Sequence, residues 1–284
     1  MGLALETLVG YVASGTGSTT YDALANNNNQ SYTVRNYEDG STAYLEDVWG
    51  MTSAAAWLLS IKSPRLHDDV LGMQFAVNSY TNTGSTAIFN PQSLLPGFQQ
   101  QKLYATDVLS VTANATTATN KFLGVFNVRY ENLGGVQARL YHWNEIQPQI
   151  ANFVGIEVQP QASATVGQFG SGVALNSVSP RLKANVDYAW LGYTTSIPVG
   201  AIVMQGVYLG NLYVGGPGSY ASDDTGSFFI EKSLQYGTAH IPVINSNNQG
   251  GTFVFCADVT ASTHPNVILQ FAELKSRLGN PVQP

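Results

Sequence analysis

The four histidines are the first side chains to consider for metal binding or acid–base chemistry. They are His67, His142, His240 and His264, and no two are separated by the two to four residues that are typical of neighbouring metal ligands. A lone histidine is more often an ordinary polar or partly buried side chain than a ligand. The sequence therefore predicts no metal site and no catalytic histidine.

The acidic residues offer two other chemistries, glycoside hydrolysis and calcium binding. Hydrolysis needs two carboxylates that face each other across a cleft, and nothing in the spacing of the 18 acids selects a pair. The adjacent pairs Asp68/Asp69 and Asp223/Asp224 could supply oxygen ligands to Ca²⁺. Neither pair lies in a loop of alternating Asp and Asn, so solvated turn residues are the favoured interpretation, and cation binding stays an open alternative.

The sequence also gives only weak support for a cysteine nucleophile, a phosphate-binding loop or a sugar-binding site built from tyrosine rings. The single cysteine, Cys256, lies in an apolar run and is expected to be a buried, inert thiol. The glycines of 15–18 and 170–173 are not followed by the lysine of a phosphate-binding loop. Four tyrosines near loops could stack on sugars, but most tyrosines of a β-protein are packing partners; they are Tyr208, Tyr213, Tyr220 and Tyr236. We therefore expect no catalytic residue, no metal and no cofactor.

The elements that would position these residues read mostly as short strands. Apolar runs of strand length alternate with clusters of Gly, Pro, Asn and Ser. Residues 44–59 are ambiguous between a short helix and a strand. The glycine-bearing segment 131–135 is expected to join two strands as a hairpin. The predicted strands are 70–77, 103–111, 122–130, 136–143, 153–158, 186–193, 201–209, 228–231, 241–244, 252–259 and 267–274.

This succession predicts an all-β fold, a jelly-roll β-barrel or sandwich with an inserted or decorating β subdomain and extended termini. The expected domains are residues 1–56 as an N-terminal arm with a short helix or strand, 57–274 as the barrel with its insertion, and 275–284 as a C-terminal tail. Two complete eight-stranded barrels side by side would be tight in 284 residues, so we favour one barrel. Removal of residues 1–42 is then expected to leave the barrel folded and to abolish assembly.

Targeting and membrane signals are weak in this sequence. The N-terminus lacks the basic start and apolar stretch of a secretory signal. Residues 197–214 approach the length of a bilayer span, but they contain a proline, glycines, Gln205 and Asn211. Strands that are joined by a tight turn explain that pattern better than a membrane helix does.

The most unusual property of the chain is its lack of charge. Only 11% of the residues are charged, against roughly 25% in typical soluble domains, and the net charge is −6. Twelve scattered Lys and Arg argue against a basic nucleic-acid groove and leave only weak local contacts open. Charged side chains are depleted at the cores of protein interfaces, and a surface of neutral polar residues promotes self-association. These features favour a subunit of a coat or lattice.

Two segments carry a family resemblance. Residues 57–75, WLLSIKSPRLHDDVLGMQF, look like the opening of a viral jelly roll, and residues 194–203, TTSIPVGAIV, look like a later barrel strand that is entered through a proline turn. With its length, the chain resembles the larger major capsid protein of tailless icosahedral bacteriophages with an internal membrane, the single-jelly-roll, sphaerolipovirus-like lineage. The resemblance implies an upright barrel, capsomers that contain a second coat protein, and contact with an underlying lipid vesicle.

Three hypotheses of function follow. The first is a structural, non-enzymatic coat protein that self-associates, together with a second coat protein, into an icosahedral capsid. Its partners would be other coat subunits and an internal membrane but no specific nucleic acid, and its location would be the virion, assembled in the host cytoplasm. The second is a receptor- or glycan-binding β-sandwich of a spike or lectin type. The third is a carbohydrate-active β-sandwich enzyme with two converging carboxylates.

Overall fold

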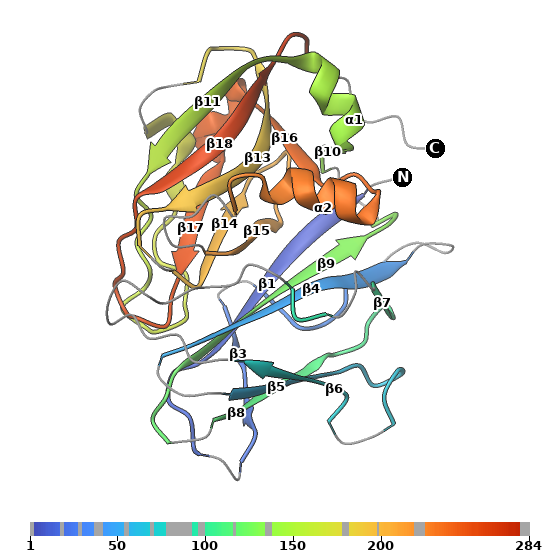
Figure 1. Ribbon diagram of the computed structural model, residues 1–284, viewed down its shortest axis with the longest axis vertical. Helices are drawn as coiled ribbons and strands as arrows, with labels where there is room; N and C mark the ends of the chain where they lie inside the picture. The colour runs from blue at the N-terminus through green and yellow to red at the C-terminus, as the bar shows by residue number, and fades with distance from the viewer. Residues whose placement is uncertain are drawn as a thin grey trace.

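Figure 1 shows the computed structural model of the chain, in which strands dominate both the lower and the upper part. The described residues are 3–17, 20–27, 30–36, 42–53, 57–68, 71–77, 93–95, 100–115, 118–133, 138–177, 182–197, 199–218 and 225–278.

The described strands form four antiparallel sheets, two from each half of the chain. The N-terminal half gives one sheet in the order β3-β1-β9-β4-β7 and a second in the order β2-β8-β5-β6. Their bounds are β1 Ala4–Val12, β2 Asp22–Ala23, β3 Ala25–Asn26, β4 Ala43–Thr52, β5 Trp57–Lys62, β6 Met73–Val77, β7 Gln101–Leu103, β8 Ser110–Ala115 and β9 Phe122–Tyr130.

The C-terminal half repeats this plan and adds two α-helices. Its sheets have the orders β10-β16-β13-β18-β11 and β12-β17-β14-β15. The bounds are β10 Leu140–Tyr141, α1 Trp143–Ile146, β11 Ile150–Val158, β12 Val173–Ala174, β13 Asp187–Thr195, β14 Ala201–Gln205, β15 Tyr213–Pro217, α2 Phe228–Tyr236, β16 Ile241–Asn245, β17 Phe253–Ala257 and β18 Val267–Leu274. Short 3₁₀ helices span Gln147–Gln149, Leu175–Ser177 and Ser246–Gly251.

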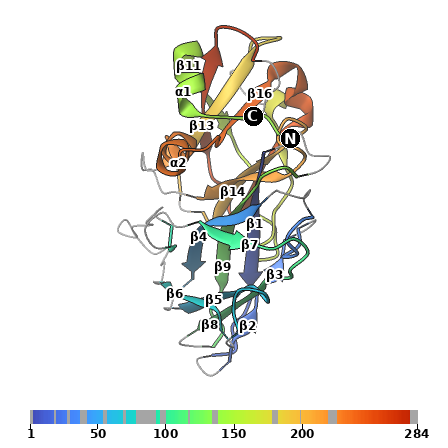
Figure 2. The same cartoon turned by 90° about the vertical axis from the view of Figure 1, so that its right-hand side faces the viewer.

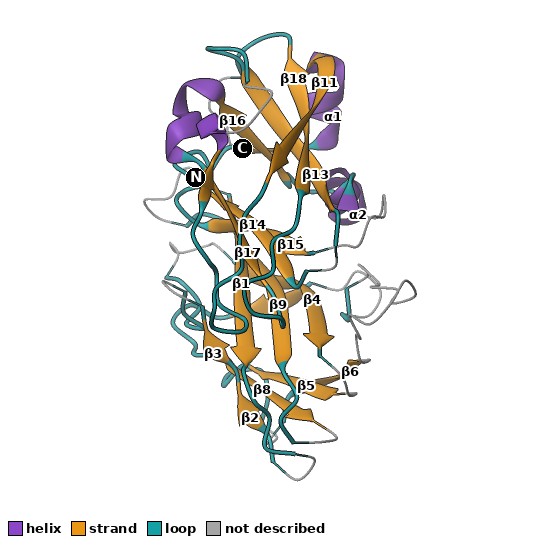
Figure 3. Cartoon of the chain, turned by 90° about the vertical axis from the view of Figure 1, so that its left-hand side faces the viewer, coloured by secondary structure: helices purple, strands orange, loops and turns teal. Residues whose placement is uncertain are grey.

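The four sheets stack as layers along the long axis of the molecule. In Figures 1 and 2 the β5 and β8 sheet lies at the bottom and the β1, β4 and β9 sheet above it; the β14 sheet and then the β13 and β18 sheet follow. β15 packs across β1 and β9, which joins the two halves. Figure 3 shows the same order from the opposite side. One hydrophobic core cluster therefore runs through both sandwiches.

Strand β9 shows why the sequence produces a buried middle layer. All nine of its residues are buried, which requires both faces to be covered. On one face, Phe122 and Phe126 pack against Trp57 and Tyr32 of the N-terminal half. On the opposite face, Asn127 donates a hydrogen bond to the Gly215 carbonyl oxygen of the C-terminal half. The chain from Phe122 to Tyr130 is thus apolar on one face and carries its polar groups toward the other sandwich.

The N-terminal segment differs from the expected arm. β1 pairs with β9 over its whole length, from Ala4 to Val12, and Leu5 and Val9 are buried. The ambiguous region 44–59 forms strands β4 and β5, with residues 54–56 outside the described part. β1 is buried on both faces, so its apolar residues do not alternate with polar ones, and the sequence lacks the usual signal of a half-buried strand there.

The arrangement also differs from one barrel with an insertion. The described strands form a two-sheet sandwich before residue 131 and another after residue 138, so each half of the chain forms its own pair of sheets. Short strands make this possible within 284 residues, because several edge strands have only two or three residues. The described strands form no closed barrel, and the all-β sandwich class is confirmed.

Several local predictions were wrong for identifiable reasons. Residues 228–231 begin helix α2, whose buried residues Phe228, Phe229, Lys232 and Ser233 recur with helical spacing and whose C-terminus is closed by Gly237 at φ 63°. Residues 134 and 135 of the expected hairpin turn lie outside the described residues, but the flanking strands β9 and β10 belong to different sheets and do not pair with each other. The predicted strand 103–111 is interrupted, because β7 ends at Leu103 and β8 begins at Ser110.

The apolar stretch 197–214 contributes to two paired strands, as its turn residues suggested. β14 and β15 pair antiparallel from Ala201–Pro217 to Gln205–Tyr213. Among the described residues, no helix has the length and apolar character needed to cross a bilayer.

Candidate functional site: a buried polar network between the two sandwiches

The histidines do not come together in one site. His67 accepts a hydrogen bond at Nδ1 from the Ser63 amide at 3.1 Å, His142 precedes α1, and His264 is exposed. His240 alone is fully buried. In the described part of the chain, no three His, Cys, Asp or Glu residues are grouped as metal ligands would be.

The remaining sequence candidates are dispersed as well. Asp68 is exposed, whereas Asp69 and the pair Asp223/Asp224 lie outside the described residues. Cys256 is buried, as expected, and burial raises the pKa of its thiol, with a smaller contribution from Asp258. Of the four tyrosines, Tyr208 lies under the Arg139 guanidinium, Tyr213 is buried against Phe169, Tyr220 is outside the described residues, and Tyr236 belongs to the network described next.

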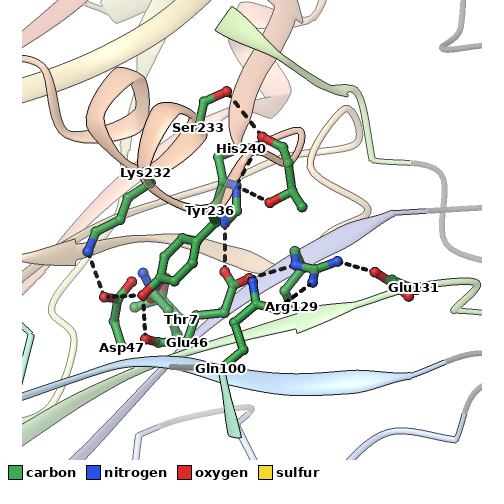
Figure 4. A network of polar contacts seen from close by, with 12 residues as sticks. Thr7, Glu46, Asp47, Gln100, Arg129, Glu131, Lys232, Ser233, Tyr236 and His240 are labelled. Atoms are coloured by element: carbon green, nitrogen blue, oxygen red, sulfur yellow. Dashed lines mark hydrogen bonds and ion pairs between the residues drawn. The ribbon is translucent and has the colours of Figure 1, made fainter. Parts of the chain in front are cut away.

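A β-bulge in β4 creates the only extended cluster of buried charges that we find in the described residues. The β4–β9 register shifts between Leu45 and Asp47, so Glu46 is the extra residue. Consecutive strand residues normally point to opposite faces, and a bulge changes this direction locally. Glu46 and Asp47 consequently both reach partners in the C-terminal half (Figure 4).

Glu46 is held by three side chains from three segments. Its Oε1 accepts hydrogen bonds from Arg129 Nε at 2.6 Å and Gln100 Nε2 at 2.8 Å. Its Oε2 lies 2.6 Å from His240 Nε2. Because an ionised carboxylate only accepts hydrogen bonds, Nε2 of His240 is the donor, and His240 Nδ1 then faces Thr238 Oγ1 at 2.9 Å.

Asp47 is held by helix α2. Its Oδ1 lies 2.6 Å from Lys232 Nζ and 3.1 Å from the Tyr236 hydroxyl. The Tyr236 hydroxyl also lies 2.6 Å from the Glu46 carbonyl oxygen, to which it donates. Lys232 Nζ stands 5.3 Å from the Trp49 ring centre, so the ammonium group is enclosed by aromatic faces as well as by the carboxylate.

The two neighbouring carboxylates have opposite pKa directions. Burial favours the neutral form of Glu46, but His240 and Arg129 outweigh it and lower its pKa. Burial dominates at Asp47 and raises its pKa, although Lys232 opposes the shift. Burial, followed by the two carboxylates, raises the pKa of Tyr236. Among its buried formal charges, Glu46 and Asp47 are thus balanced by Arg129 and Lys232, and Arg129 also pairs with the more exposed Glu131 at 2.6 Å.

This arrangement supports a structural role better than a catalytic one. The side chains of Glu46, Asp47 and His240 are 0%, 1% and 2% exposed, so no substrate atom can approach the acid and base groups from solvent. Each of these groups is already bonded to a protein partner. The network instead fastens α2 and the His240 segment to β4 and β9.

Two further contacts join the sandwiches without charge. The Gly215 amide donates to Thr7 Oγ1 at 2.9 Å, which links β15 to β1. Asn27 Nδ2 donates to the Gly167 carbonyl oxygen at 2.6 Å, and Asn27 Oδ1 accepts from the Phe169 amide at 2.6 Å. The interface is therefore polar and directional along its length, which fixes how one sandwich lies on the other.

Sequence reasoning assigned no role to these residues. The available signal was a pair of acids inside the apolar run 44–50 and a lysine inside the aromatic run 228–232. Charges in such runs are rarely buried without a partner. The sequence offered no way to know that residues some 190 positions apart, Glu46 and His240, would meet.

Comparisons with known proteins give little beyond the structure itself. No family model matches the chain, and no curated protein matches its sequence. Among solved structures, a crystal structure of the STIV MCP, a major capsid protein, aligns over 96% of this chain and 97% of its own. The identity is 11% and the TM-score is 0.19. At that TM-score the two chains do not share a demonstrable fold, so this likeness has no weight in assigning function.

Proposed function

We propose that this protein is a non-enzymatic coat subunit that self-associates into a closed or extended protein shell. The observation that carries the proposal is the distribution of charge. The chain has only 12 Lys and Arg and 18 Asp and Glu, and nine of these 30 are buried in the described residues. The buried ones are Glu6, Glu46, Asp47, Asp107, Arg129, Arg139, Asp187, Lys232 and Asp258.

Burial of these groups makes the exterior even poorer in charge than the composition indicates. Soluble monomers normally keep a charged exterior that resists association. Neutral polar and apolar surface can instead be covered by neighbouring subunits at a small cost, because few charges must be desolvated. Both the Glu46 network and the neutral hydrogen bonds of Thr7 and Asn27 join the two sandwiches. Such a stack of sheets suits a subunit that must have the same shape in every copy.

The expected partners and location come from the family resemblance in the sequence. In this proposal the subunit assembles with copies of itself and with a second coat protein, over an internal membrane, in a virion that forms in the host cytoplasm. The charge distribution supports self-association, whereas the second protein and the membrane depend on the resemblance alone.

The test is the molar mass of the full chain by light scattering over a concentration series, with negative-stain images of each fraction. We expect mass to grow without a fixed limit, and sheets or shells to appear. Because the contacts are poor in charge, the growth should change little between about 0.05 M and about 0.5 M salt, although the Debye length falls severalfold over this range.

Two results would contradict the proposal. A small oligomer of constant size at every concentration would favour the receptor- or glycan-binding alternative. A protein that is monomeric at all concentrations, and stays monomeric when lipid vesicles are added, would contradict the proposal of a self-assembling coat subunit.

A further inference from the structure

The edges of the four sheets differ sharply in how they are protected. An unpaired edge strand exposes N–H and C=O groups that can pair with another chain, and proteins commonly avoid this by making edge strands very short. Among the described strands, β2, β3, β10 and β12 have two residues and β7 has three. β15 has five, but all are buried, and it packs on β1. β6 also has only five.

β11 is the exception, because it is a nine-residue edge strand that, among the described strands, pairs with β18 alone. Its sequence, IANFVGIEV, contains no proline and no lysine, and Glu157 is its only charge. Phe153 is 64% exposed, which is the highest exposure among the large hydrophobic side chains of the described residues. Of the usual edge protections, β11 has only a β-bulge at its start, between Ile150 and Asn152, so the edge from Asn152 to Val158 carries neither a bulge nor a proline or lysine.

The backbone direction of β11 shows which groups are available. In an antiparallel pair, alternate residues direct their N–H and C=O groups toward the neighbouring strand and away from it. The Phe153 amide donates to the side-chain oxygen of Asn152 at 2.9 Å, so it points away from β18. By the same alternation, Gly155 and Glu157 present their backbone groups on the outer edge.

The sequence of this edge is complementary to itself. If two copies pair antiparallel about a two-fold axis at Val154, Phe153 of each copy lies opposite Gly155 of the other, and Asn152 lies opposite Ile156. Ala151 is the extra residue of a β-bulge in β11, so the regular pairing ends at Asn152. An aromatic ring over a cross-strand glycine is a favourable pair, and no like charges are opposed. Phe153 and Gly155 both direct backbone groups outward, so the register forms hydrogen bonds as well, once the Phe153 amide exchanges its Asn152 side-chain acceptor for a carbonyl oxygen of the second copy.

We propose that β11 is a contact between subunits, in which the β11 edges of two copies pair antiparallel about Val154 and join their upper sheets into one ten-stranded sheet. The occupant is a second copy because an edge strand recognises another strand, and this strand is complementary to its own sequence. The inference rests on the proposed self-association and specifies one of its contacts.

The test compares Phe153→Lys with Leu234→Lys in the full chain. Leu234 lies on α2 and is 61% exposed, so both variants place a lysine at an exposed apolar position, but only the first places it on the β11 edge. We expect Phe153→Lys to raise the concentration for half-maximal association at least about tenfold, and Leu234→Lys to leave it unchanged. Circular dichroism checks that both variants are folded.

A cysteine variant tests the register independently. Val154→Cys would face its own symmetry mate in a pair whose Cα separation suits a disulfide, and the native Cys256 is buried. We expect oxidised Val154→Cys to form a covalent dimer and Leu234→Cys to stay uncrosslinked.

The outcomes separate the two proposals. If the wild type associates and Phe153→Lys associates equally well, the β11 contact is wrong and the coat proposal stands. If Val154→Cys associates as the wild type does but forms no covalent dimer on oxidation, the register about Val154 is wrong. If the wild type itself never associates, both proposals fail.

Discussion

At the scale of single residues, several of the few charged side chains are buried, nine of 30 in the described residues. Lys232 and Asp47 form an ion pair at 2.6 Å with side chains that are 9% and 1% exposed. A buried pair contributes little net stability over an apolar pair of the same shape, but removal of one partner leaves an uncompensated charge. The network therefore determines which surfaces of the two sandwiches can meet.

Because the Lys232–Asp47 pair is buried, removal of one partner should cost more stability than replacement of both. Lys232→Met should lower the free energy of unfolding by about 3 kcal/mol, because it leaves Asp47 buried without its cation. The double variant Asp47→Leu/Lys232→Met should recover most of this loss, since Met and Leu suit the aromatic surroundings and Tyr236 keeps the Glu46 carbonyl oxygen as its acceptor. Denaturant unfolding of the three proteins measures both values; a double variant that is no more stable than the single one would contradict the account.

Asp258 predicts a pH dependence of stability. Burial raises its pKa to about 6, against the opposing hydrogen bonds from Thr263 and backbone amides. Between about pH 4 and about pH 6 the folded state therefore binds more protons than the unfolded state, and the contribution of Asp258 to stability falls as pH rises. A shift of two units corresponds to roughly 3 kcal/mol.

Asp258→Asn isolates this contribution. The asparagine Oδ1 can accept from the Val259 amide, and its Nδ2 can donate to Thr263 Oγ1, whose proton goes to the Thr260 carbonyl oxygen. We expect the variant to gain stability relative to the wild type as pH is raised from about 4.5 to about 7.5. Urea unfolding at each pH gives the difference, and a difference that does not vary with pH would show that Asp258 titrates normally.

At the scale of elements, β1 and the bulged strand β4 organise the middle layer. β1 lies between β3 and β9 and contacts β15 of the other sandwich, so it belongs to both halves of the core. The bulge at Glu46 lets a single strand supply two adjacent acids to α2 and His240. Loss of either feature would affect both sandwiches at once.

The position of β1 reverses the expectation for an N-terminal deletion. Removal of residues 1–12 should prevent the protein from folding, because it exposes one side of β9 and removes the buried side chains of Leu5, Leu8 and Val9 from the core. The matched control is removal of residues 1–3, which precede the strand. Near-ultraviolet circular dichroism and the recovered soluble yield compare the two; a cooperative, soluble 13–284 protein would show that β1 is dispensable.

At the scale of the whole molecule, four stacked sheets share one continuous core beneath a weakly charged exterior. The sandwiches are joined by the Glu46 network and by the bonds of Thr7 and Asn27 to Gly215 and Gly167. A stack of this kind presents sheet edges and loops to neighbouring subunits. If subunits bind one another there, the molar mass should grow with concentration, and Phe153→Lys in β11 should weaken that growth.

The sequence by itself determined the class of the fold and the character of the surface. Short apolar runs of strand length between turn residues established the all-β class, and strand β9 from Phe122 to Tyr130 was located to the residue. Both follow from local sequence, because strand periodicity and composition act over a few residues. The scarcity of charge was likewise visible from composition.

Only the tertiary structure decided the pairing of sheets into two sandwiches, the placement of β1 in the middle layer, and the meeting of Glu46 with His240. The segment 228–236 forms a helix where Phe228 packs between Trp49 and Tyr193 and Lys232 lies over the Trp49 ring. These outcomes depend on contacts between residues far apart in the chain, whose energies no local pattern encodes. Burial on both faces and a single bulged residue, rather than any motif, placed the charges where they now hold the molecule together.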